Sequence, residues 1–457
     1  MLTYTIPKNL NIPIYEYLYK CIKADILNGS LKPKEKLPSK RSLSGQLKIS
    51  LITVEHAYDL LLTEGYIYAI EKKGYYVESV SFEKIIKKTE TYKEDADLTE
   101  KNIKDSYFPY NTWSKLTRKV LSDNVSLNPS PFNGELSLRK AIAKHLYEFH
   151  ELRISPSSII IGAGSEYLYS LLIQYFGLNS VYALENPGHK NISNIYRLNN
   201  AQIQYIDLDD KGLDISKLDK TNATIVHISP AHHFPSGITM PLKRRMEILN
   251  WARKNNGYII EDDYDSEFRI NSRPIPPLYQ LDNNDRVIYM NTFSKSLSSS
   301  FRIAYMVLPD SLVKDFEDKL GFYHNTVSSL DQKILAEFIN GAYFERHLNR
   351  KRKIYRSIHN QLMEKMKREV NKYDLNIKES ESGLHFILEH HFKSKDKDLS
   401  VMFKKANLPC TMLSDYLKNY EETGKIVVNY SGLNEEDIDD FISKLDKVFA
   451  GIKKNHD

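Results

Sequence analysis

The chain has 457 residues, of which 41% are apolar and 27% are charged, and its formal net charge is +5. At roughly 100–200 residues per domain, this length exceeds one hydrophobic core and predicts two to four domains. The composition is that of a globular protein, and no apolar run approaches the roughly 18–20 residues that span a bilayer, which argues against a membrane protein.

The termini and the cysteines give few further signals. Residues 1–11 lack a basic segment followed by an apolar stretch, so we infer no secretory signal and expect a cytoplasmic protein without a membrane partner. Cys21 and Cys410 lie far apart and form no CxxC or metal-ligand spacing, so we expect free thiols.

Residues 1–79 are predicted to form a small domain of three helices and a hairpin. The first helix follows Pro13 and ends at Asn28-Gly29. Ser39 is a good N-cap for a second helix, and Ser50 or Thr53 opens a third. The three-residue break between these two short helices is typical of a helix-turn-helix.

The charge of this domain is only weakly basic. Residues 1–80 carry 11 Lys or Arg and 8 Asp or Glu, which on its own fits a solvated surface as well as a nucleic-acid partner. Lys72, Lys73 and Gly74 fall at the predicted hairpin tip, where a wing touches phosphates or the minor groove.

The order of motifs in this domain resembles the GntR family of winged-helix repressors. The matching pieces are Leu37-Pro38-Ser39, Arg41, Leu43, Ser50, Thr53-Val54, Ala57-Tyr58, Leu61, Glu64-Gly65 and Gly74-Tyr75-Tyr76-Val77. The resemblance implies that double-stranded operator DNA is contacted by Ser39, Arg41, Ser50, Thr53, Lys72, Lys73 and Gly74. Leu51 and Glu55 stand where family members often carry basic residues, which indicates a different operator or more reliance on phosphate and wing contacts.

The rest of the chain divides into three regions that differ in composition and pattern. Residues 80–106 are highly charged, without Gly or Pro, and are predicted to be a linker. In residues 107–309 strand-like runs alternate with helical stretches, which predicts an α/β domain with a largely parallel sheet. Residues 310–457 are helix-rich with late strand signals, which predicts a smaller α+β domain.

Three turns in the α/β domain follow strands in a fixed order. Gly162-Ala163-Gly164-Ser165 precedes an apolar helix and suits a phosphate, because glycines let backbone N–H groups approach it. His189 follows a second strand end and could lie over a planar ligand. His232-His233 follow a third strand, but neighbouring side chains point apart and no further ligands cluster there, so we expect no metal.

Two later segments carry polar chemistry. Asp262, Asp263 and Tyr264 lie at the carboxyl end of a strand, where ligands of open sheets bind. A carboxylate there can hold a pyridinium proton, although a Mg²⁺ site also fits the carboxylates alone. Lys295 follows the next strand among hydroxyl residues and suits an amine that attacks an aldehyde.

In this order the segments resemble the fold-type-I aminotransferases, and the whole chain resembles a MocR-type member of the GntR family. The resemblance implies a bound pyridoxal 5′-phosphate, with Lys295 as its Schiff-base lysine and Asp262 at the pyridine nitrogen. It assigns Tyr264 to the phenolic oxygen and His189, in place of a larger aromatic, to the ring. The phosphate would be held by Gly164, Ser165, Thr292, Ser294 and Arg302. His233 stands where the family more often has Gln.

One position near the C-terminus departs from the enzymes of this fold. They hold the substrate carboxylate with an Arg shortly before the pattern that here reads Val428-Asn429-Tyr430-Ser431, and the aligned residue is Val427. A planar, bidentate Arg is hard to replace at such a site. Lys425, two residues earlier, is expected to point to the other face of the strand.

These features predict a regulator that binds operator DNA and senses pyridoxal 5′-phosphate, with the aminotransferase-like domain as a sensor and not an enzyme. In this interpretation it controls vitamin B6 synthesis genes. One alternative is a regulator that responds to an amino acid forming an external aldimine. Another is an active aminotransferase with an added DNA-binding module. The resemblance also implies a homodimer.

Overall fold

The computed structural model describes residues 4, 7, 12–78, 107–123, 128–268, 275–378 and 383–454. The chain divides into two compact units, Met1–Asp95 and Ala96–Asp457, each of which is described by itself. The predicted linker, residues 80–106, lies outside the described residues, so its boundaries stay predictions. No helix in the described ranges is long and apolar enough to cross a bilayer.

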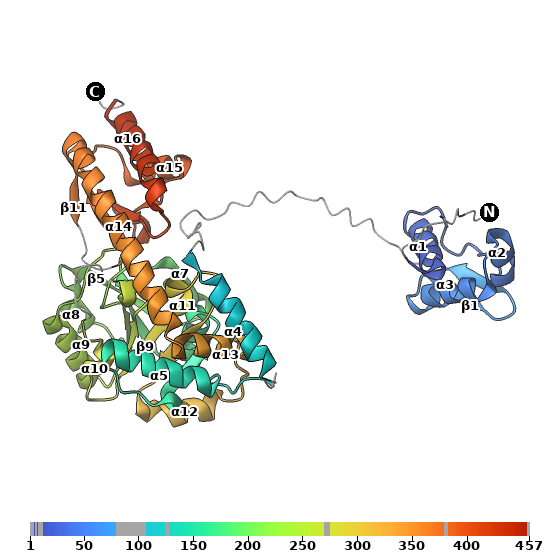
Figure 1. Cartoon of the computed structure of the whole chain (residues 1–457), viewed down its shortest axis with the longest axis horizontal. Coiled ribbons are helices and arrows are strands. Elements are labelled where there is room, and N and C mark those ends of the chain that lie inside the picture. The colour runs from blue at the N-terminus through green and yellow to red at the C-terminus, as the bar shows by residue number, and fades with distance from the viewer. Residues whose placement is uncertain are drawn as a thin grey trace. The chain divides into compact units, whose positions relative to one another are not determined.

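The first unit packs three helices beside a hairpin (Figure 1). The helices are α1 (Ile14–Leu27), α2 (Lys40–Leu47) and α3 (Leu51–Thr63), and the antiparallel strands are β1 (Ile67–Ile70) and β2 (Gly74–Val77). Its core is formed by apolar side chains at helical spacing, which include the fully buried Ile22, Leu43, Val54, Ala57 and Leu61. This is the predicted winged helix-turn-helix.

Serine caps define where the two short helices begin. The Ser39 hydroxyl accepts a 3.2 Å hydrogen bond from the Ser42 N–H, and the Ser50 hydroxyl accepts one of 3.1 Å from the Thr53 N–H. Each bond satisfies one of the free N–H groups of a first helical turn. Of the two predicted openers of α3, Ser50 is therefore the cap.

The second unit is built on an eight-stranded sheet of order β3-β10-β9-β8-β7-β4-β5-β6. Neighbours from β9 to β5 are parallel, whereas β10 is antiparallel to both β3 and β9, and β6 to β5. The strands are β3 (Ile159–Gly162), β4 (Val181–Asn186), β5 (Gln202–Asp209), β6 (Gly212–Leu213), β7 (Ile225–Ile228), β8 (Tyr258–Asp262), β9 (Val287–Thr292) and β10 (Ala304–Val307). This is the predicted α/β sheet.

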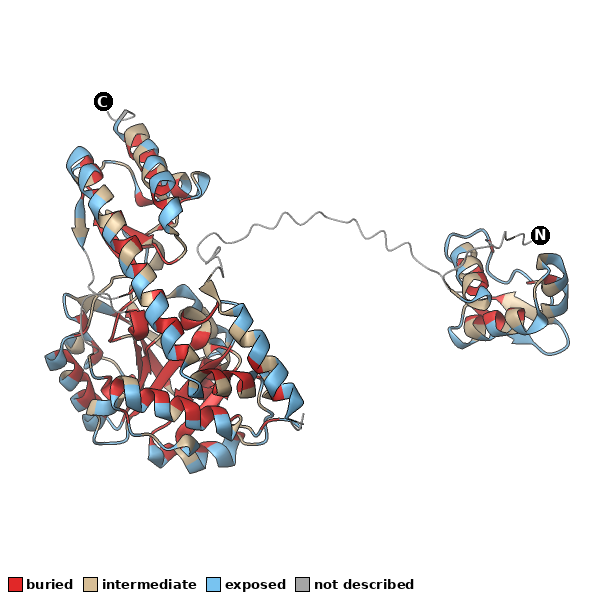
Figure 2. Cartoon of the chain, in the orientation of Figure 1, coloured by how far each residue is buried: buried red, intermediate tan, exposed pale blue. Residues whose placement is uncertain are grey.

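Helices cover both faces of this sheet, and the strands between them are buried (Figure 2). Successive residues of β9 show why: Ile288 and Met290 pack into one apolar cluster, and Val287 and Tyr289 into clusters on the other face. The helices are α4 (Tyr110–Ser122), α5 (Leu136–His150), α6 (Ser165–Phe176), α7 (Lys190–Leu198), α8 (Ile215–Leu218), α9 (Leu242–Lys254), α10 (Leu278–Leu281), α11 (Phe293–Ser296), α12 (Asp310–Leu320) and α13 (Ser329–Asn340).

The C-terminal part is a four-stranded antiparallel sheet of order β11-β12-β14-β13 with three helices. Its elements are α14 (Tyr343–Tyr373), β11 (Asn376–Lys378), β12 (His385–Glu389), α15 (Asp396–Lys405), β13 (Cys410–Met412), β14 (Lys425–Asn429) and α16 (Ile438–Lys454). Helices α12 and α13 follow the predicted domain boundary at 309/310. They nevertheless pack on α6, α5 and α4 of the larger layer.

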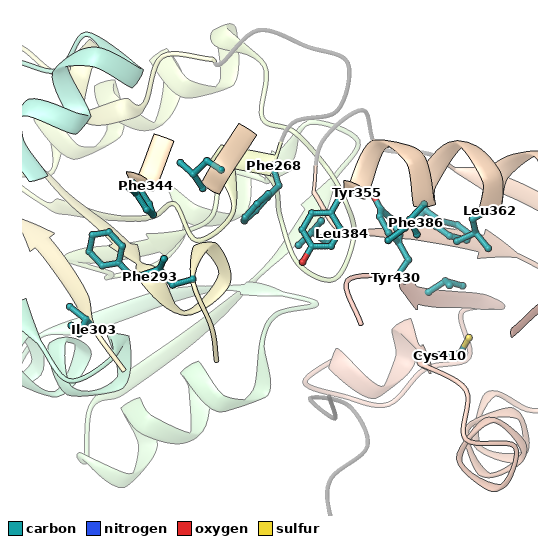
Figure 3. Close-up of a cluster of buried hydrophobic side chains, with 14 of the residues drawn as sticks. Phe268, Phe293, Ile303, Phe344, Tyr355, Leu362, Leu384, Phe386, Cys410 and Tyr430 are labelled. Atoms are coloured by element: carbon teal, nitrogen blue, oxygen red, sulfur yellow. The ribbon is translucent and has the colours of Figure 1, made fainter. Parts of the chain in front are cut away.

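Helix α14 joins the two layers through one continuous apolar core (Figure 3). Phe344 packs with Phe293 beside the large sheet, and further along the helix Leu362 belongs to the same buried cluster as Phe386 of the small sheet. The small sheet is thereby held next to the carboxyl ends of the large sheet's strands, where the predicted site residues lie.

Candidate cofactor site and DNA-binding surface

The pairing of strands brings distant segments of the predicted phosphate site together. Ala304 of β10 pairs with Gly162 of β3 on one side and with Thr292 of β9 on the other. The turn before α6, the turn after β9 and the residue Arg302 before β10 therefore meet at one edge of the sheet. Sequence spacing of about 130 residues gave no direct sign of this contact.

This edge has the donors that a phosphate needs. Gly164 has φ +90°, a backbone conformation that L side chains rarely adopt, which favours glycine at this turn. Gly164 is followed by Ser165, the first residue of α6. The free backbone N–H groups of the first turn of this helix favour an anion. Thr292 Oγ1 accepts from the Ser294 N–H at 3.1 Å and donates to Ser294 Oγ at 3.0 Å. Arg302, half exposed, forms an ion pair with Glu166 through one of its terminal nitrogens.

The two adjacent aspartates have different surroundings. Asp262, the last residue of β8, accepts a 2.6 Å hydrogen bond from the Tyr169 hydroxyl on Oδ2, and His227 Nε2 lies 3.7 Å from the same oxygen. The described residues give Oδ1 no hydrogen bond. A carboxylate with one fixed and one open oxygen fits a pyridinium N–H.

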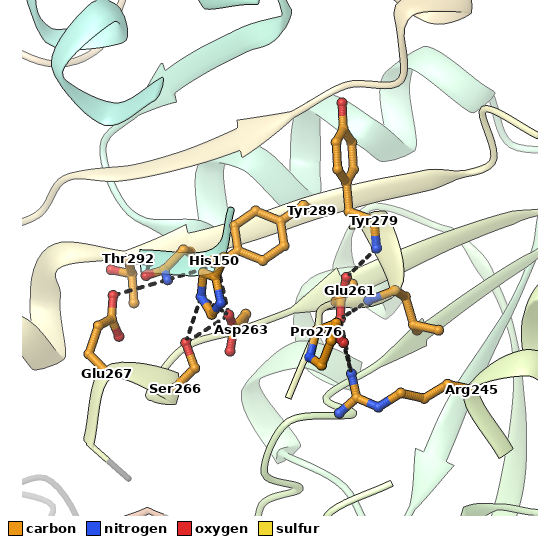
Figure 4. A network of polar contacts seen from close by, with 12 residues as sticks. His150, Arg245, Glu261, Asp263, Ser266, Glu267, Pro276, Tyr279, Tyr289 and Thr292 are labelled. Carbon is orange, nitrogen blue, oxygen red and sulfur yellow. Dashed lines mark hydrogen bonds and ion pairs between the residues drawn. The ribbon is translucent and has the colours of Figure 1, made fainter. Parts of the chain in front are cut away.

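Asp263 belongs to a buried structural network instead (Figure 4). Its Oδ2 accepts hydrogen bonds from the hydroxyls of Tyr289 at 2.7 Å and Ser266 at 2.8 Å, and His150 Nε2 lies at 3.5 Å. Burial raises the pKa of Asp263, but these partners outweigh it and hold the pKa below its ordinary range. The network holds Asp263 through Oδ2, while its buried Oδ1 has no hydrogen-bond partner among the described residues. Asp262 remains the carboxylate that the sequence predicts for the ligand.

Lys295 lies on the short helix α11, directly after β9. Within the described ranges its Nζ takes part in no hydrogen bond or ion pair, as an amine that reacts with an aldehyde requires. Its backbone carbonyl accepts a 2.8 Å hydrogen bond from Lys351 of α14, and His347 Nε2 lies 2.9 Å from the carbonyl of Ser296. Sequence reasoning missed both α14 residues, because nothing local relates them to Lys295.

Aromatic rings from the loops after β4, β7 and β8 and from β12 lie close to one another. His189 caps α7, and its ring lies 5.6 Å from that of Phe234. The Tyr264 hydroxyl lies 3.3 Å from His232 Nδ1. His232 and His385 of β12 are 4.5 Å apart between ring centres. Burial, then His232 and His233, and finally Lys295 lower the pKa of His385, so this ring is neutral.

The paired histidines diverge, as the sequence predicted. His232 Nδ1 lies 2.8 Å from Asp265 Oδ2, whereas His233 Nδ1 lies 2.7 Å from Ser236 Oγ and its Nε2 3.5 Å from Glu185. The described residues contain no group of three or more metal-ligating side chains.

The position at which enzymes of this fold carry the substrate-binding Arg lies in apolar surroundings. Val427 is 1% exposed and clusters with Ile387 and Leu413, against which Phe234 and Tyr416 pack. The prediction for Lys425 was wrong: residues two apart on a strand share a face, and Lys425 and Val427 oppose Glu389 and Ile387 on β12. Lys425 is instead engaged by Glu389 at 3.5 Å.

In the first unit the predicted DNA contacts divide into caps and exposed groups. Ser39 and Ser50 cap their helices, and Thr53 Oγ1 lies 2.7 Å from Ser50 Oγ. Arg41 is exposed on α2, Lys72 and Lys73 lie in the turn between β1 and β2, and Gly74 is the first residue of β2, with Lys72 at φ +62° and Gly74 at +107°. The acidic Glu55 forms a 2.9 Å ion pair with Lys40 of α2.

The fold and these residues define a fold-type-I, aminotransferase-like domain, preceded by a winged helix-turn-helix. Residues 102–445 match the family model for aminotransferases of class I and II, and residues 14–77 match that for bacterial regulatory proteins of the gntR family. In solved structures the fold is that of an archaeal alanine:glyoxylate aminotransferase (TM-score 0.68, 22% identity, 76% of this chain and 88% of that chain). It is also that of the Pyrococcus horikoshii kynurenine aminotransferase (TM-score 0.66, 22%, 76% and 88%).

Full-length relatives share both domains. The chain is 36% identical to the HTH-type transcriptional regulator YdeL of Bacillus subtilis (96% of this chain, 97% of the relative). It is 24% identical to MocR, a probable rhizopine catabolism regulatory protein of Rhizobium meliloti (98% and 96%). It is 27% identical to PdxR, the pyridoxine biosynthesis regulator of Corynebacterium glutamicum (91% and 91%). The chain therefore belongs to the MocR type of transcriptional regulators in the GntR family.

Proposed function

We propose that this regulator binds pyridoxal 5′-phosphate at Lys295 and that the cofactor itself is the signal that changes its affinity for operator DNA. The roles follow the sequence prediction: Asp262 at the pyridine nitrogen, Tyr264 at the phenolic oxygen, His189 against the ring, and Gly164, Ser165, Thr292, Ser294 and Arg302 around the phosphate. Ser39, Arg41, Ser50, Thr53, Lys72, Lys73 and Gly74 contact DNA. The protein acts in the cytoplasm as a homodimer that reads two half-sites.

The apolar cluster around Val427 carries the choice of signal. An α-amino acid would bring a carboxylate to this wall, where Val427, Ile387 and Leu413 offer no donor. The neighbouring His385 and His233 cannot supply a charge, because burial lowers both pKa values, that of His233 to about 3. Burying an unpaired carboxylate costs several kcal/mol. This cost is about as large as the whole binding free energy of a weak ligand. Similarity to PdxR supports a role in vitamin B6 synthesis.

When bound, the cofactor would supply an aldehyde for condensation with a primary amine, with release of water. Lys295 Nζ would provide that amine, and Asp262 would hold the proton on the pyridine nitrogen. Borohydride reduction of the loaded protein followed by peptide mass analysis should place the modification on Lys295. Lys295→Ala should abolish it, whereas Lys319→Ala, an exposed lysine of α12, should not. Unchanged labelling in Lys295→Ala would overturn the assignment.

The signal is tested by gel shifts on the upstream region of its own gene. We expect the shift to depend on added pyridoxal 5′-phosphate and to be indifferent to a panel of amino acids. A shift that ignores the cofactor and responds only to an amino acid would favour the amino-acid sensor. Steady conversion of an amino acid and a keto acid would favour an active aminotransferase, the activity of the solved proteins that share this fold.

A further inference from the structure

Two exposed aliphatic side chains begin helix α3. Leu51 is 40% exposed and Ile52 63%, directly after the cap Ser50. The buried face of the helix is formed by other residues, Val54, Ala57, Tyr58 and Leu61. Leu51 and Ile52 therefore present apolar surface outward at the start of the second helix of the helix-turn-helix.

The polar side chains next to this pair on α3 are already engaged. Glu55, one turn after Leu51, is held by Lys40 at 2.9 Å, and the hydroxyls of Ser50 and Thr53 lie 2.7 Å from each other. Arg41 and Lys48 are exposed and form no ion pair within the described residues. The helix-turn-helix thus exposes an apolar pair at the start of α3 together with two cations in and after α2, a combination that suits a polyanion with apolar groups between its charges.

In a helix-turn-helix the N-terminal residues of the second helix meet base edges in the major groove. There the thymine 5-methyl is the apolar group that distinguishes one base pair from another. We propose that Leu51 and Ile52 read thymine methyl groups of the operator, in place of a guanine contact by a basic residue. This inference rests on the proposed DNA-binding function and names the base that the helix selects.

The test removes only the methyl group. Specific duplexes are first selected from a random library with the full-length protein, and each thymine is then replaced by deoxyuridine. We expect one or two positions in each half-site where the replacement weakens binding about fourfold, the value of one buried methylene-sized group. Leu51→Ala and Ile52→Ala should weaken binding to the thymine duplex and have little further effect on the deoxyuridine duplex. Leu27→Ala, which truncates a leucine of α1 whose 46% exposure lies between those of Leu51 and Ile52, is the matched control.

Specific binding that no deoxyuridine replacement weakens would overturn this inference and leave the DNA-binding function intact. So would equal losses of the two variants on both duplexes, or a loss of self-association with unchanged DNA affinity, which would make the pair an interface between copies. Absence of any sequence-specific binding would overturn the proposed function together with the inference.

Discussion

The hydroxyl of Tyr169 donates a 2.6 Å hydrogen bond to Asp262, although the two residues lie 93 positions apart. This bond fixes the carboxylate at the end of β8 and leaves its second oxygen open. The next residue, Asp263, is committed to Tyr289 and Ser266 on another side of the chain. Two identical neighbours therefore have different hydrogen-bond partners, and their substitution should have separate effects.

Asp262→Asn should weaken retention of pyridoxal 5′-phosphate and shift its absorbance with little loss of thermal stability, because the amide cannot hold a pyridinium proton. Asp263→Asn should lower the free energy of unfolding by about 1–3 kcal/mol, the cost of a disrupted buried polar group, and retain the spectrum. Cofactor dialysis and chemical denaturation measure the two effects. If Asp262→Asn lowered stability and Asp263→Asn weakened cofactor retention, the roles given to the two aspartates would have to be exchanged.

Gly383→Ala should destabilise the second unit. Gly383 has φ +84°, and a Cβ would lie 1.8 Å from the His232 ring. The backbone conformation alone costs an L-residue about 1–2 kcal/mol, and overpacking adds about 1–3 kcal/mol. Gly177→Ala is the matched control, since Gly177 has φ +81° with no atom within 4 Å. Equal losses of stability in the two variants would contradict the contact with His232.

Val427→Arg should create a response to amino acids. A guanidinium at this position offers the bidentate donor that a carboxylate needs, and hydrogen bonds to charged groups contribute about 1.5–3 kcal/mol, or roughly tenfold or more in affinity. Thermal stability should fall, because Val427 is buried in an apolar cluster. Val427→Met controls for size. The readout is the change in cofactor absorbance on titration with amino acids, and a folded variant without any gain would contradict the role given to this wall.

Glu185→Gln should reduce the dependence of stability on pH. Burial raises the pKa of Glu185 to about 8, against about 4.5 when unfolded, while the Ser229 N–H bond opposes this in part. Between these values the unfolded chain loses a proton that the folded chain keeps, so stability falls as pH rises from about 4.5 to about 8. Glutamine cannot ionise, so its profile should be flatter there.

Unfolding by urea at pH 5 to 8.5 measures this slope without added cofactor. Glu148→Gln, at an exposed site on α5, should leave the wild-type slope unchanged. A wild-type slope in Glu185→Gln would mean that Glu185 is ionised in the folded protein throughout this range.

Local signals in the sequence predicted most elements of the fold. Ser39 and Ser50 cap their helices as expected, and the runs before Gly162, Asp262 and Thr292 are strands. The relation of Lys425 to Val427 was also readable from the two-residue period of a strand, and the prediction was wrong because that period was not applied. These features depend on neighbours a few residues away.

Contacts between distant segments were not readable in this way. Lys351, which bonds the carbonyl of Lys295, lies 56 residues from it, and His385 reaches His232 from a different sheet. No periodicity or cap reports such pairs, because they arise only when α14 and the small sheet pack on the large one.

The sequence by itself determined the two modules, their elements and the order of the cofactor segments, since caps, turns and apolar periodicity act over a few residues. Only the tertiary structure decided which donors hold each carboxylate. Sequence alternation places Asp262 and Asp263 on different sides but cannot say which donors lie on each side. The hydroxyls of Tyr289 and Ser266 on one side, and of Tyr169 on the other, decide it, because a buried carboxylate is defined by the donors that the fold brings to it.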